Sequence, residues 1–325
     1  MEVGVPVIRH LQVPEDSRTE VTVNAAVGID IGGTFIKIVA VSPEGAILYR
    51  TRLSIDDSSV HELQKHIRRE ILKINGRLGE VQCVGISSPG IVGCDGKSIS
   101  WMKGRMNVLE GLSWTQALHR RNPVPLINDA NAALKGEAWV GAGVGCKDIV
   151  MLTLGTGVGG SIICNGRPLT GSTWRAGHLG HISLNVSGQK GITNTPGSLE
   201  DAIGECTLTR RSAGRFTSTK VLVEAHLAGD PFATRVWHKS IKFLAVGLVS
   251  IINSVDPERI ILGGGIARAG HALFVPLRRF MDVYEWRPNN RGVEIVPAQL
   301  DDEAGAIGSA KHAMENYETS GTVSD

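Results

Sequence analysis

Three groups of residues in this sequence have the types and spacing needed to bind phosphate and move a proton. Asp30 stands directly before Gly32-Gly33-Thr34, and a second glycine-rich segment covers residues 155–160. Without a Cβ, backbone N–H groups can close around an anion, and a carboxylate beside such a turn can hold Mg²⁺ directly or through water. Asp129 follows Asn128 where a predicted strand meets a predicted helix, a position that suits a general base.

Each of these patterns also has a structural interpretation that the residues leave open. Asp30 could cap the turn of an ordinary β-hairpin, and Asp129 could be a helix N-cap. Segment 155–160 matches the G-x-G-x-x-G spacing of NAD-binding proteins. However, residues 161–164 favour a strand where that motif needs a helix, and no acidic residue follows about 20 positions later. A Walker-type loop is absent, since Gly96-Lys97-Ser98 lacks the required upstream glycine.

The segments around these residues predict an α/β protein in which strands deliver side chains to the edge of a sheet. Strands are expected at 25–30, 36–41, 46–53, 81–87, 125–128, 149–154, 161–164, 259–262 and 293–296, and helices at 60–74, 130–140, 230–254, 270–283 and 303–316. Both halves contain a strand, a glycine turn and a strand, which indicates two related α/β units. Residues 165–198 are rich in Gly, Asn, Thr and Ser, and long irregular segments of this kind are usually functional.

Composition limits the possible partners and compartments. The 325 residues, 42% of them hydrophobic, suggest about two domains, and the net charge of +2 comes with no clustered basic face for nucleic acid. Five scattered cysteines without a C-x-x-C pair argue against disulfides and a cysteine zinc cluster. Residues 1–20 do not resemble a signal peptide, and the longest apolar run, 243–252, is too short to cross a membrane. We therefore expect a cytoplasmic protein that binds neither nucleic acid nor membrane.

Six short motifs stand in a fixed order along the chain. They are Gly28-Ile29-Asp30-Ile31-Gly32-Gly33-Thr34, Ser88-Pro89-Gly90, Asn128-Asp129-Ala130-Asn131, Thr153-Leu154-Gly155-Thr156-Gly157-Val158-Gly159-Gly160, Ile261-Leu262-Gly263-Gly264-Gly265 and Asp302-Glu303-Ala304-Gly305. Together they resemble the ROK family of sugar kinases and sugar-responsive repressors, within the actin/hexokinase-like superfamily. The resemblance covers about residues 25–315 and implies two actin-like (ribonuclease H-like) α/β domains with a substrate cleft between them.

The resemblance also implies a division of the chain. Residues 1–22 are expected to form an N-terminal extension, and residues 23–129 a small domain that a C-terminal helix at about 303–318 completes. Residues 130–302 are expected to form the large domain. Family members are often dimers or tetramers, so a homodimer is expected.

The activity that the resemblance implies is transfer of the γ-phosphate of ATP to the primary (C6) hydroxyl of a hexose such as glucose. Asp129 would take the hydroxyl proton. The sugar would contact Gly90, Asn128, Asp129, His178, His181 and Glu200. ATP would contact Asp30, Gly32, Gly33, Thr34, Lys37, Gly155, Thr156, Gly157, Gly159, Gly263, Gly264 and Gly265, with Mg²⁺ accompanying it near Asp30. Many of the 40 glycines, Gly28 included, fall in these motifs and are expected to contact phosphate, sugar or adenosine.

One part of the family pattern is altered. The family reads G-E-x-G-H and then C-x-C-G-x-x-G-C-x-E, in which the His and three Cys bind a structural zinc. Here the cysteine positions hold Gly191, Thr193 and Ser198, which supply no thiolate. We predict a protein without zinc, and stoichiometric zinc in chelator-washed protein would contradict this. His181 and Glu200 remain and are expected to contact the sugar, although His181 could merely hold the loop and Glu200 could cap a helix beginning near Ser198.

His178 stands where most glucokinases of the family have Glu. A carboxylate accepts two hydroxyl hydrogen bonds, whereas a neutral imidazole donates one and accepts one, so the preference around C1 or C2 of the sugar should change. G-H-x-G-H is also similar to bacterial N-acetylmannosamine kinases of the family, which makes N-acetylmannosamine or another amino sugar the alternative substrate. A sugar-sensing regulator is a second alternative, weakened because residues 1–24 contain no two-helix DNA-binding pattern.

Overall fold

The computed structural model describes residues 24–55, 60–102 and 106–321. The predicted extension at 1–22 lies outside these ranges. The strands are β1 (Ala26–Ile31), β2 (Phe35–Val41), β3 (Ile47–Ser54), β4 (Cys83–Ser88), β5 (Ile91–Val92), β6 (Ile99–Trp101), β7 (Leu126–Asn128), β8 (Ile149–Leu154), β9 (Val158–Cys164), β10 (Arg167–Pro168), β11 (Arg259–Gly263) and β12 (Glu294–Pro297). The helices are α1 (Val60–Leu78), α2 (Trp114–Ala117), α3 (Asp129–Val140), α4 (Leu199–Ile203), α5 (Leu208–Arg211), α6 (Thr219–Leu227), α7 (Pro231–Val255), α8 (His271–Tyr284) and α9 (Ala304–Gly321).

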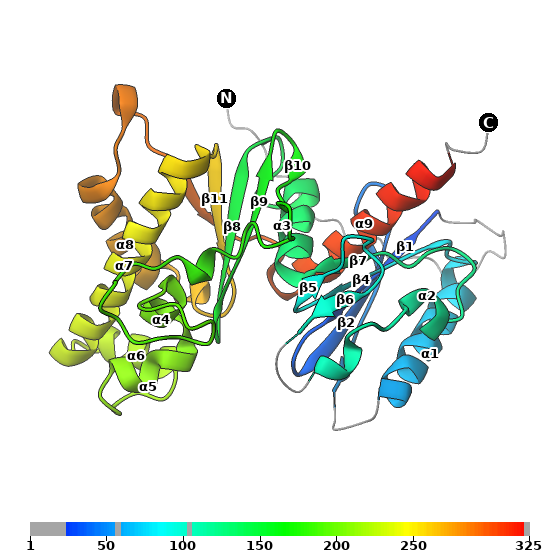
Figure 1. Ribbon diagram of the computed structural model, residues 1–325, viewed down its shortest axis with the longest axis horizontal. Helices are drawn as coiled ribbons and strands as arrows, with labels where there is room; N and C mark the ends of the chain where they lie inside the picture. Colours follow the sequence, from blue (N-terminus) through cyan, green and yellow to red (C-terminus); the bar gives the residue numbers. More distant parts are fainter. Residues whose placement is uncertain (1–23, 56–59, 103–105, 322–325) are drawn as a thin grey trace.

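Two five-stranded sheets stand side by side, with α3 between them (Figure 1). The first has the strand order β3-β2-β1-β4-β7 and the second β10-β9-β8-β11-β12. In each, the first central strand pairs antiparallel with the strand that follows it and parallel with a later one: β1 with β2 and β4, β8 with β9 and β11. The strand, turn and strand similarity expected from the sequence is therefore present in the topology.

The first sheet is covered by α1 on one face and by α9 on the other. Alternate residues of β1 face opposite ways, so Val27 and Ile29 join the core under α1 while Ala26 packs with Ala306 and Ala310 of α9. The apolar stripe predicted for 60–74 is buried in α1, as Leu63, Ile67, Ile71 and Ile74.

Glycines bring α9 unusually close to its neighbours. A Cβ on Gly28 would collide with the carbonyl oxygen of Ala306, and one on Gly85 with that of Ser309. The expectation that Gly28 contacts a ligand is therefore wrong, because this glycine makes room for a helix. Where α3 crosses α9, a glycine again permits close approach, since a Cβ on Gly136 would lie 2.6 Å from the carbonyl oxygen of Ala304.

The second sheet packs against α7, which begins as the sequence predicts. Asp230 is the N-cap, its carboxylate accepting hydrogen bonds from the N–H groups of Phe232 and Ala233, and Pro231 opens the helix. The inner face buries residues spaced at helical periodicity, namely Trp237, Ile241, Leu244, Leu248 and Ile252. Among the described helices, none has the length and apolar character required to span a bilayer.

Candidate active site

Asp30 is the last but one residue of the buried strand β1, just before the β1–β2 turn. Its carboxylate accepts a hydrogen bond from the Ser87 hydroxyl at 2.8 Å, and the Lys37 ammonium lies 3.6 Å away on the paired strand β2. Gly305, at the start of α9, packs its Cα against the same carboxylate. Burial raises the pKa of Asp30, although Ser87 and Lys37 act in the opposite direction.

The turn itself carries Gly32, Gly33 and Thr34, and the last two are exposed. The Gly32 N–H closes the turn on the carbonyl of Phe35 at 3.0 Å. Asp30 is thus not the cap of this turn, because its carboxylate points to Ser87 on β4 and to Lys37. Asp30 nevertheless lies at the carboxyl end of β1, and ligands of open α/β sheets bind beyond this end of the strands.

The junction of β7 and α3 separates the roles of Asn128 and Asp129. Asn128 is the N-cap: its side-chain oxygen accepts from the N–H groups of Ala130 at 3.0 Å and Asn131 at 3.3 Å. Its amide nitrogen donates to the Gly90 carbonyl at 3.0 Å. This hydrogen bond joins two residues that are predicted to contact the sugar. The alternative in which Asp129 is the N-cap is therefore wrong.

Asp129 occupies the first turn of α3 and is partly buried. One carboxylate oxygen accepts from the N–H of Ala130 at 2.8 Å. Burial, and then repulsion from Asp30, raise the pKa of Asp129 to about 6. The carboxylate is thus still mostly ionised at neutral pH and basic enough to accept a proton.

The β8–β9 turn lies close to Asp129. Gly159 packs beside Ala130, the residue after Asp129, at 3.6 Å between the Ala130 Cβ and a Cβ built on the glycine. The Gly155 N–H closes the turn on the Gly157 carbonyl at 2.9 Å. The chain then enters β9 and not a helix, so the sequence-based argument against an NAD site is confirmed.

The glycines after β11 flank the same turn. Gly263 pairs in parallel register with Thr153 of β8, and Gly264 (φ +83°) rests against the backbone of Leu154. The predicted phosphate and adenosine segments 155–159 and 263–265 are therefore neighbours at one edge of the second sheet. The Thr156 carbonyl accepts a hydrogen bond from the N–H of Cys206 at 2.9 Å.

His178 and His181 come from a short turn that packs against β9. Their rings are stacked, with centroids 6.3 Å apart and planes 10° from parallel. Gly160 lies against the Gly177 carbonyl, which seats this turn beside the β8–β9 turn. Burial, and secondly the neighbouring His181, lower the pKa of His178, so its imidazole is neutral at pH 7 with one donor and one acceptor.

Glu200 lies in α4, but it does not cap that helix. Ser198 is the N-cap, and its hydroxyl accepts from the N–H of Asp201 at 3.1 Å. One carboxylate oxygen of Glu200 accepts from the N–H of Val158, the first residue of β9 directly after the β8–β9 turn, at 3.0 Å. An amino acid predicted to bind the sugar thus directly contacts the segment predicted to bind phosphate.

Two serines at the end of β4 belong to this region. Ser87 is not predicted from the sequence, and Ser88 enters only as part of the motif Ser88-Pro89-Gly90, without a role of its own. Ser87 holds Asp30, and the hydroxyl of Ser88, fully buried opposite Asn128, has no hydrogen-bond partner among the described residues. Polar residues that close an otherwise apolar strand are the signal that could have identified them.

The three positions that lack the family cysteines have other uses. Gly191 packs against the Asp201 carboxylate, Thr193 is hydrogen-bonded to Thr195 at 3.1 Å, and Ser198 caps α4. Over the ranges that the structure describes, His, Cys, Asp and Glu form no group of three or more that could hold a metal. The absence of zinc stays a prediction for metal analysis.

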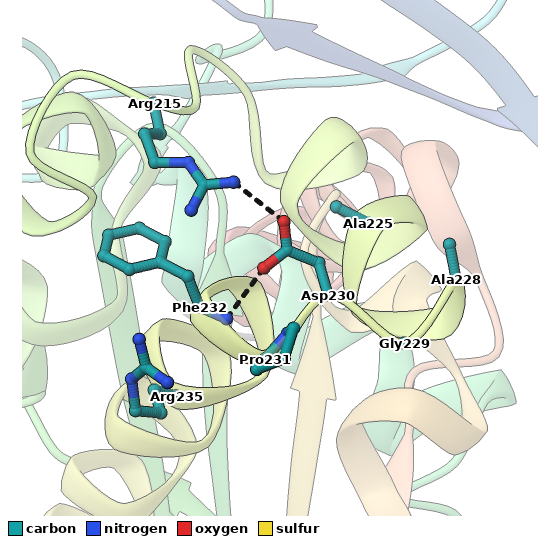
Figure 2. A pocket seen from close by; sticks show the side chains of 8 residues that line it. All are labelled: Arg215, Ala225, Ala228, Gly229, Asp230, Pro231, Phe232 and Arg235. Atoms are coloured by element: carbon teal, nitrogen blue, oxygen red, sulfur yellow. Dashed lines mark hydrogen bonds and ion pairs between the residues drawn. The ribbon is translucent and has the colours of Figure 1, made fainter.

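A cavity of about 720 Å³ lies elsewhere, at the junction of α6 and α7 (Figure 2). Its lining includes Arg215 and Arg235 on either side of the Phe232 ring, and the carboxylate of Asp230. That carboxylate pairs with Arg215 at 2.8 Å and caps α7. The cavity contains none of the predicted site residues.

The sequence of residues 26–316 matches the ROK family, and this chain belongs to that family. It is 32% identical over 310 residues to a glucokinase of Thermotoga maritima, a match that covers 89% of this chain and 97% of the relative. An N-acetylmannosamine kinase of Vibrio cholerae is 30% identical over 286 residues, covering 87% and 96%.

Solved structures give the same relationship in three dimensions. A ROK hexokinase from Thermus thermophilus superposes with a TM-score of 0.78 at 26% identity, over 91% of this chain and 99% of that one. A Streptomyces griseus ROK glucokinase in complex with glucose and AMPPNP gives a TM-score of 0.73 at 27% identity, over 90% and 99%. The predicted fold class, two actin-like α/β domains, is confirmed.

Proposed function

We propose that this chain is an ATP-dependent sugar kinase that transfers the γ-phosphate to the C6 hydroxyl of a hexose such as glucose. The relatives named above support the coarser part, a sugar kinase of the ROK family. The observation that supports transfer to a sugar hydroxyl is Asp129, a partly buried carboxylate with a pKa of about 6 at the carboxyl edge of the first sheet. It is proposed as the general base that takes the proton of the hydroxyl.

The chemistry needs little beyond positioning and charge stabilisation. The transition state of phosphoryl transfer is loose, so catalysis depends on aligning the hydroxyl with the phosphate and stabilising the phosphate oxygens. A base works best when its pKa lies near the working pH, and burial next to Asp30 moves Asp129 in that direction. We propose that Asn128 and Gly90, joined by a hydrogen bond, hold neighbouring sugar hydroxyls.

The proposed ATP site consists of the β1–β2 turn, the β8–β9 turn and residues 263–265. Lys37, beside Asp30, supplies a positive charge for phosphate oxygens. Carboxylates are the ligands that Mg²⁺ prefers, and two neighbouring ones with raised pKa values are stabilised by a cation, so Asp30 and Asp129 fit this ion. Asp30 would hold Mg²⁺ directly or through water, and the ion would neutralise phosphate charge.

Residues 23–129, with the helix at 303–318, are proposed to move as one domain against residues 130–302 when sugar binds. Closure would exclude water and prevent ATP hydrolysis. We also propose a homodimer, which a light-scattering measurement of molar mass tests.

The second candidate substrate is N-acetylmannosamine or another amino sugar. Neutral His178, stacked on His181, favours it because an imidazole in place of a carboxylate offers a donor as well as an acceptor near C1 or C2. The relative from Vibrio cholerae is named an N-acetylmannosamine kinase, which also supports this candidate.

A sugar panel tests both candidates. Sugar-dependent ADP release is measured with glucose, mannose, fructose, glucosamine, N-acetylglucosamine and N-acetylmannosamine. Glucose as the best substrate supports the first candidate, and N-acetylmannosamine or glucosamine supports the second. No ADP release with any sugar would contradict the kinase proposal and favour a sugar-binding regulator.

A further inference from the structure

The β8–β9 turn is held by a carboxylate, which is unusual for a turn proposed to receive phosphate. Oε2 of Glu200 accepts from the N–H of Val158 at 3.0 Å. The same carboxylate rests on Gly157, where a Cβ would collide with Oε2 and lie 3.1 Å from Cδ. Gly157 is therefore needed to admit Glu200, and the Val158 N–H is already committed to it.

The segment that follows Glu200 grips the turn at two further points. The N–H of Glu205 donates to the Gly155 carbonyl at 3.0 Å, and that of Cys206 donates to the Thr156 carbonyl at 2.9 Å. Arg211, which is partly buried, fixes this segment by donating to the carbonyls of Ile203 and Gly204 at 3.1 and 2.8 Å. Glu200, residues 205–206 and the turn thus form one hydrogen-bonded unit.

The histidine turn belongs to the same unit. The N–H of Leu199, next to Glu200, donates to the carbonyl of Ile182, next to His181, at 2.9 Å. Gly180 packs tightly against the Val158 carbonyl. Glu200 and the histidine turn, which carries two residues proposed to contact sugar, therefore touch the N–H and the carbonyl of Val158, the first residue of β9 after the proposed phosphate turn.

We propose that Glu200 is a positioning residue that couples sugar binding to ATP binding. Its hydrogen bond shapes the β8–β9 turn, while its negative charge opposes the incoming phosphates as long as no sugar is bound. A sugar hydroxyl that donates to the carboxylate disperses this charge and favours ATP. Because such coupling is reciprocal, ATP favours the sugar by the same factor. This inference rests on the proposed function, since it assigns sugar and phosphate to the two sides of Glu200.

Two variants separate the hydrogen bond from the charge. Glu200→Gln keeps a side-chain oxygen for Val158 but has no charge, and Glu200→Ala removes both. Affinity for the ATP analogue AMPPNP is measured by calorimetry, with and without glucose or N-acetylmannosamine. Glu224→Gln is the matched control, because it removes one charge from an exposed residue of α6 that pairs with Lys220 at 3.9 Å.

Typical coupling is about 5- to 150-fold, so we expect sugar to tighten AMPPNP binding about tenfold in the natural chain. Glu200→Gln should bind AMPPNP about tenfold more tightly than the natural chain without sugar, and sugar should add nothing. Glu200→Ala should bind it about tenfold more weakly than Glu200→Gln, because the turn loses its acceptor. The control should stay within about twofold of the natural chain, and thermal melting confirms that each variant is folded.

Two results would overturn the coupling. One is a Glu200→Gln variant whose AMPPNP affinity without sugar equals that of the natural chain. The other is a Glu200→Ala variant that binds AMPPNP as tightly as Glu200→Gln. If the natural chain phosphorylates a sugar while either result holds, only the coupling is wrong. If the natural chain neither binds AMPPNP nor phosphorylates any sugar, the proposed function fails as well.

Discussion

Replacing Asp129 with Asn should inactivate the protein and stabilise it at the same time. Burial and Asp30 raise the pKa of Asp129 from 3.8 to about 6 in the folded state. Each pKa unit corresponds to about 1.4 kcal/mol, so the ionised carboxylate costs the fold about 3 kcal/mol at most. Between about pH 4 and pH 6 the folded state binds more protons than the unfolded chain, so stability falls as the pH rises through this window.

The stability arm of this prediction compares two pH values. Near neutral pH, Asp129→Asn should raise the free energy of unfolding by about 1–3 kcal/mol, because the amide carries no charge to bury. Below about pH 3, where the carboxyl group is protonated in both states, the two proteins should unfold at the same urea concentration. An unchanged or lower midpoint of the variant at neutral pH would refute the assigned burial and repulsion.

The activity arm uses ADP release with the best sugar of the panel. In the natural chain, kcat/KM should fall about tenfold per pH unit below about 6, since the protonated base accepts nothing. Asp129→Asn should lose a factor of about 10² to 10⁴ in kcat, the usual contribution of a general base, while sugar binding survives. Near-natural turnover of the variant, or no acid limb in the natural chain, would contradict the role of Asp129.

Three further changes test neighbouring parts of the argument. Asp30→Asn removes the repulsion that helps to raise the pKa of Asp129, so the acid limb of residual kcat/KM should move to lower pH; a limb at higher pH would contradict this. Gly308→Ala places a Cβ against a backbone carbonyl of α3 and should lower the free energy of unfolding in urea by about 3 kcal/mol or more. The control is Gly76→Ala, at an exposed position of α1 with open space around it, which should raise the free energy of unfolding by up to about 1 kcal/mol. Glu137→Ala should lower the free energy of unfolding by about 3 kcal/mol in the same assay, because the buried Glu137 carboxylate accepts from three backbone N–H groups that would lose their acceptor. Glu137→Gln should lower it by less. Equal urea midpoints for both variants and the natural chain would refute the stabilising role of these three hydrogen bonds.

Most of the fold follows from local sequence patterns. The run 149–154 is apolar except for Thr153 and becomes β8 with the predicted bounds, and Asp230-Pro231 starts α7 where an N-cap and a first-turn proline are expected. Asp30, Asp129 and the glycine turns reach the sheet edges for the same reason, since the carboxyl end of a strand is defined by the strand itself. The sequence does not predict helices α5 and α6, because 203–229 mixes apolar and polar residues without a strong period.

Contacts between elements could not be predicted, since spacing along one element does not say which other element packs against it. Asn128 and Asp129 both suit an N-cap, and the choice depends on the Gly90 carbonyl, which lies 38 residues earlier and engages the Asn128 amide. Glu200 shows the same limit, because its partner Val158 lies 42 residues away in the chain.

Glu137 is the strongest case of such a contact. Nothing in its neighbourhood in the sequence distinguishes it from an exposed helical glutamate, yet it is fully buried. Its carboxylate accepts from the N–H of Ala142, just after α3, and from those of Gln299 and Leu300, just before α9. Since Gln299 and Leu300 lie just before α9, this one side chain ties the C-terminal half of α3 to the segment that leads into α9. Glu137 and its three donors all lie within residues 130–302, the proposed large domain, so we expect these hydrogen bonds to stabilise that domain and to stay intact if the domains close.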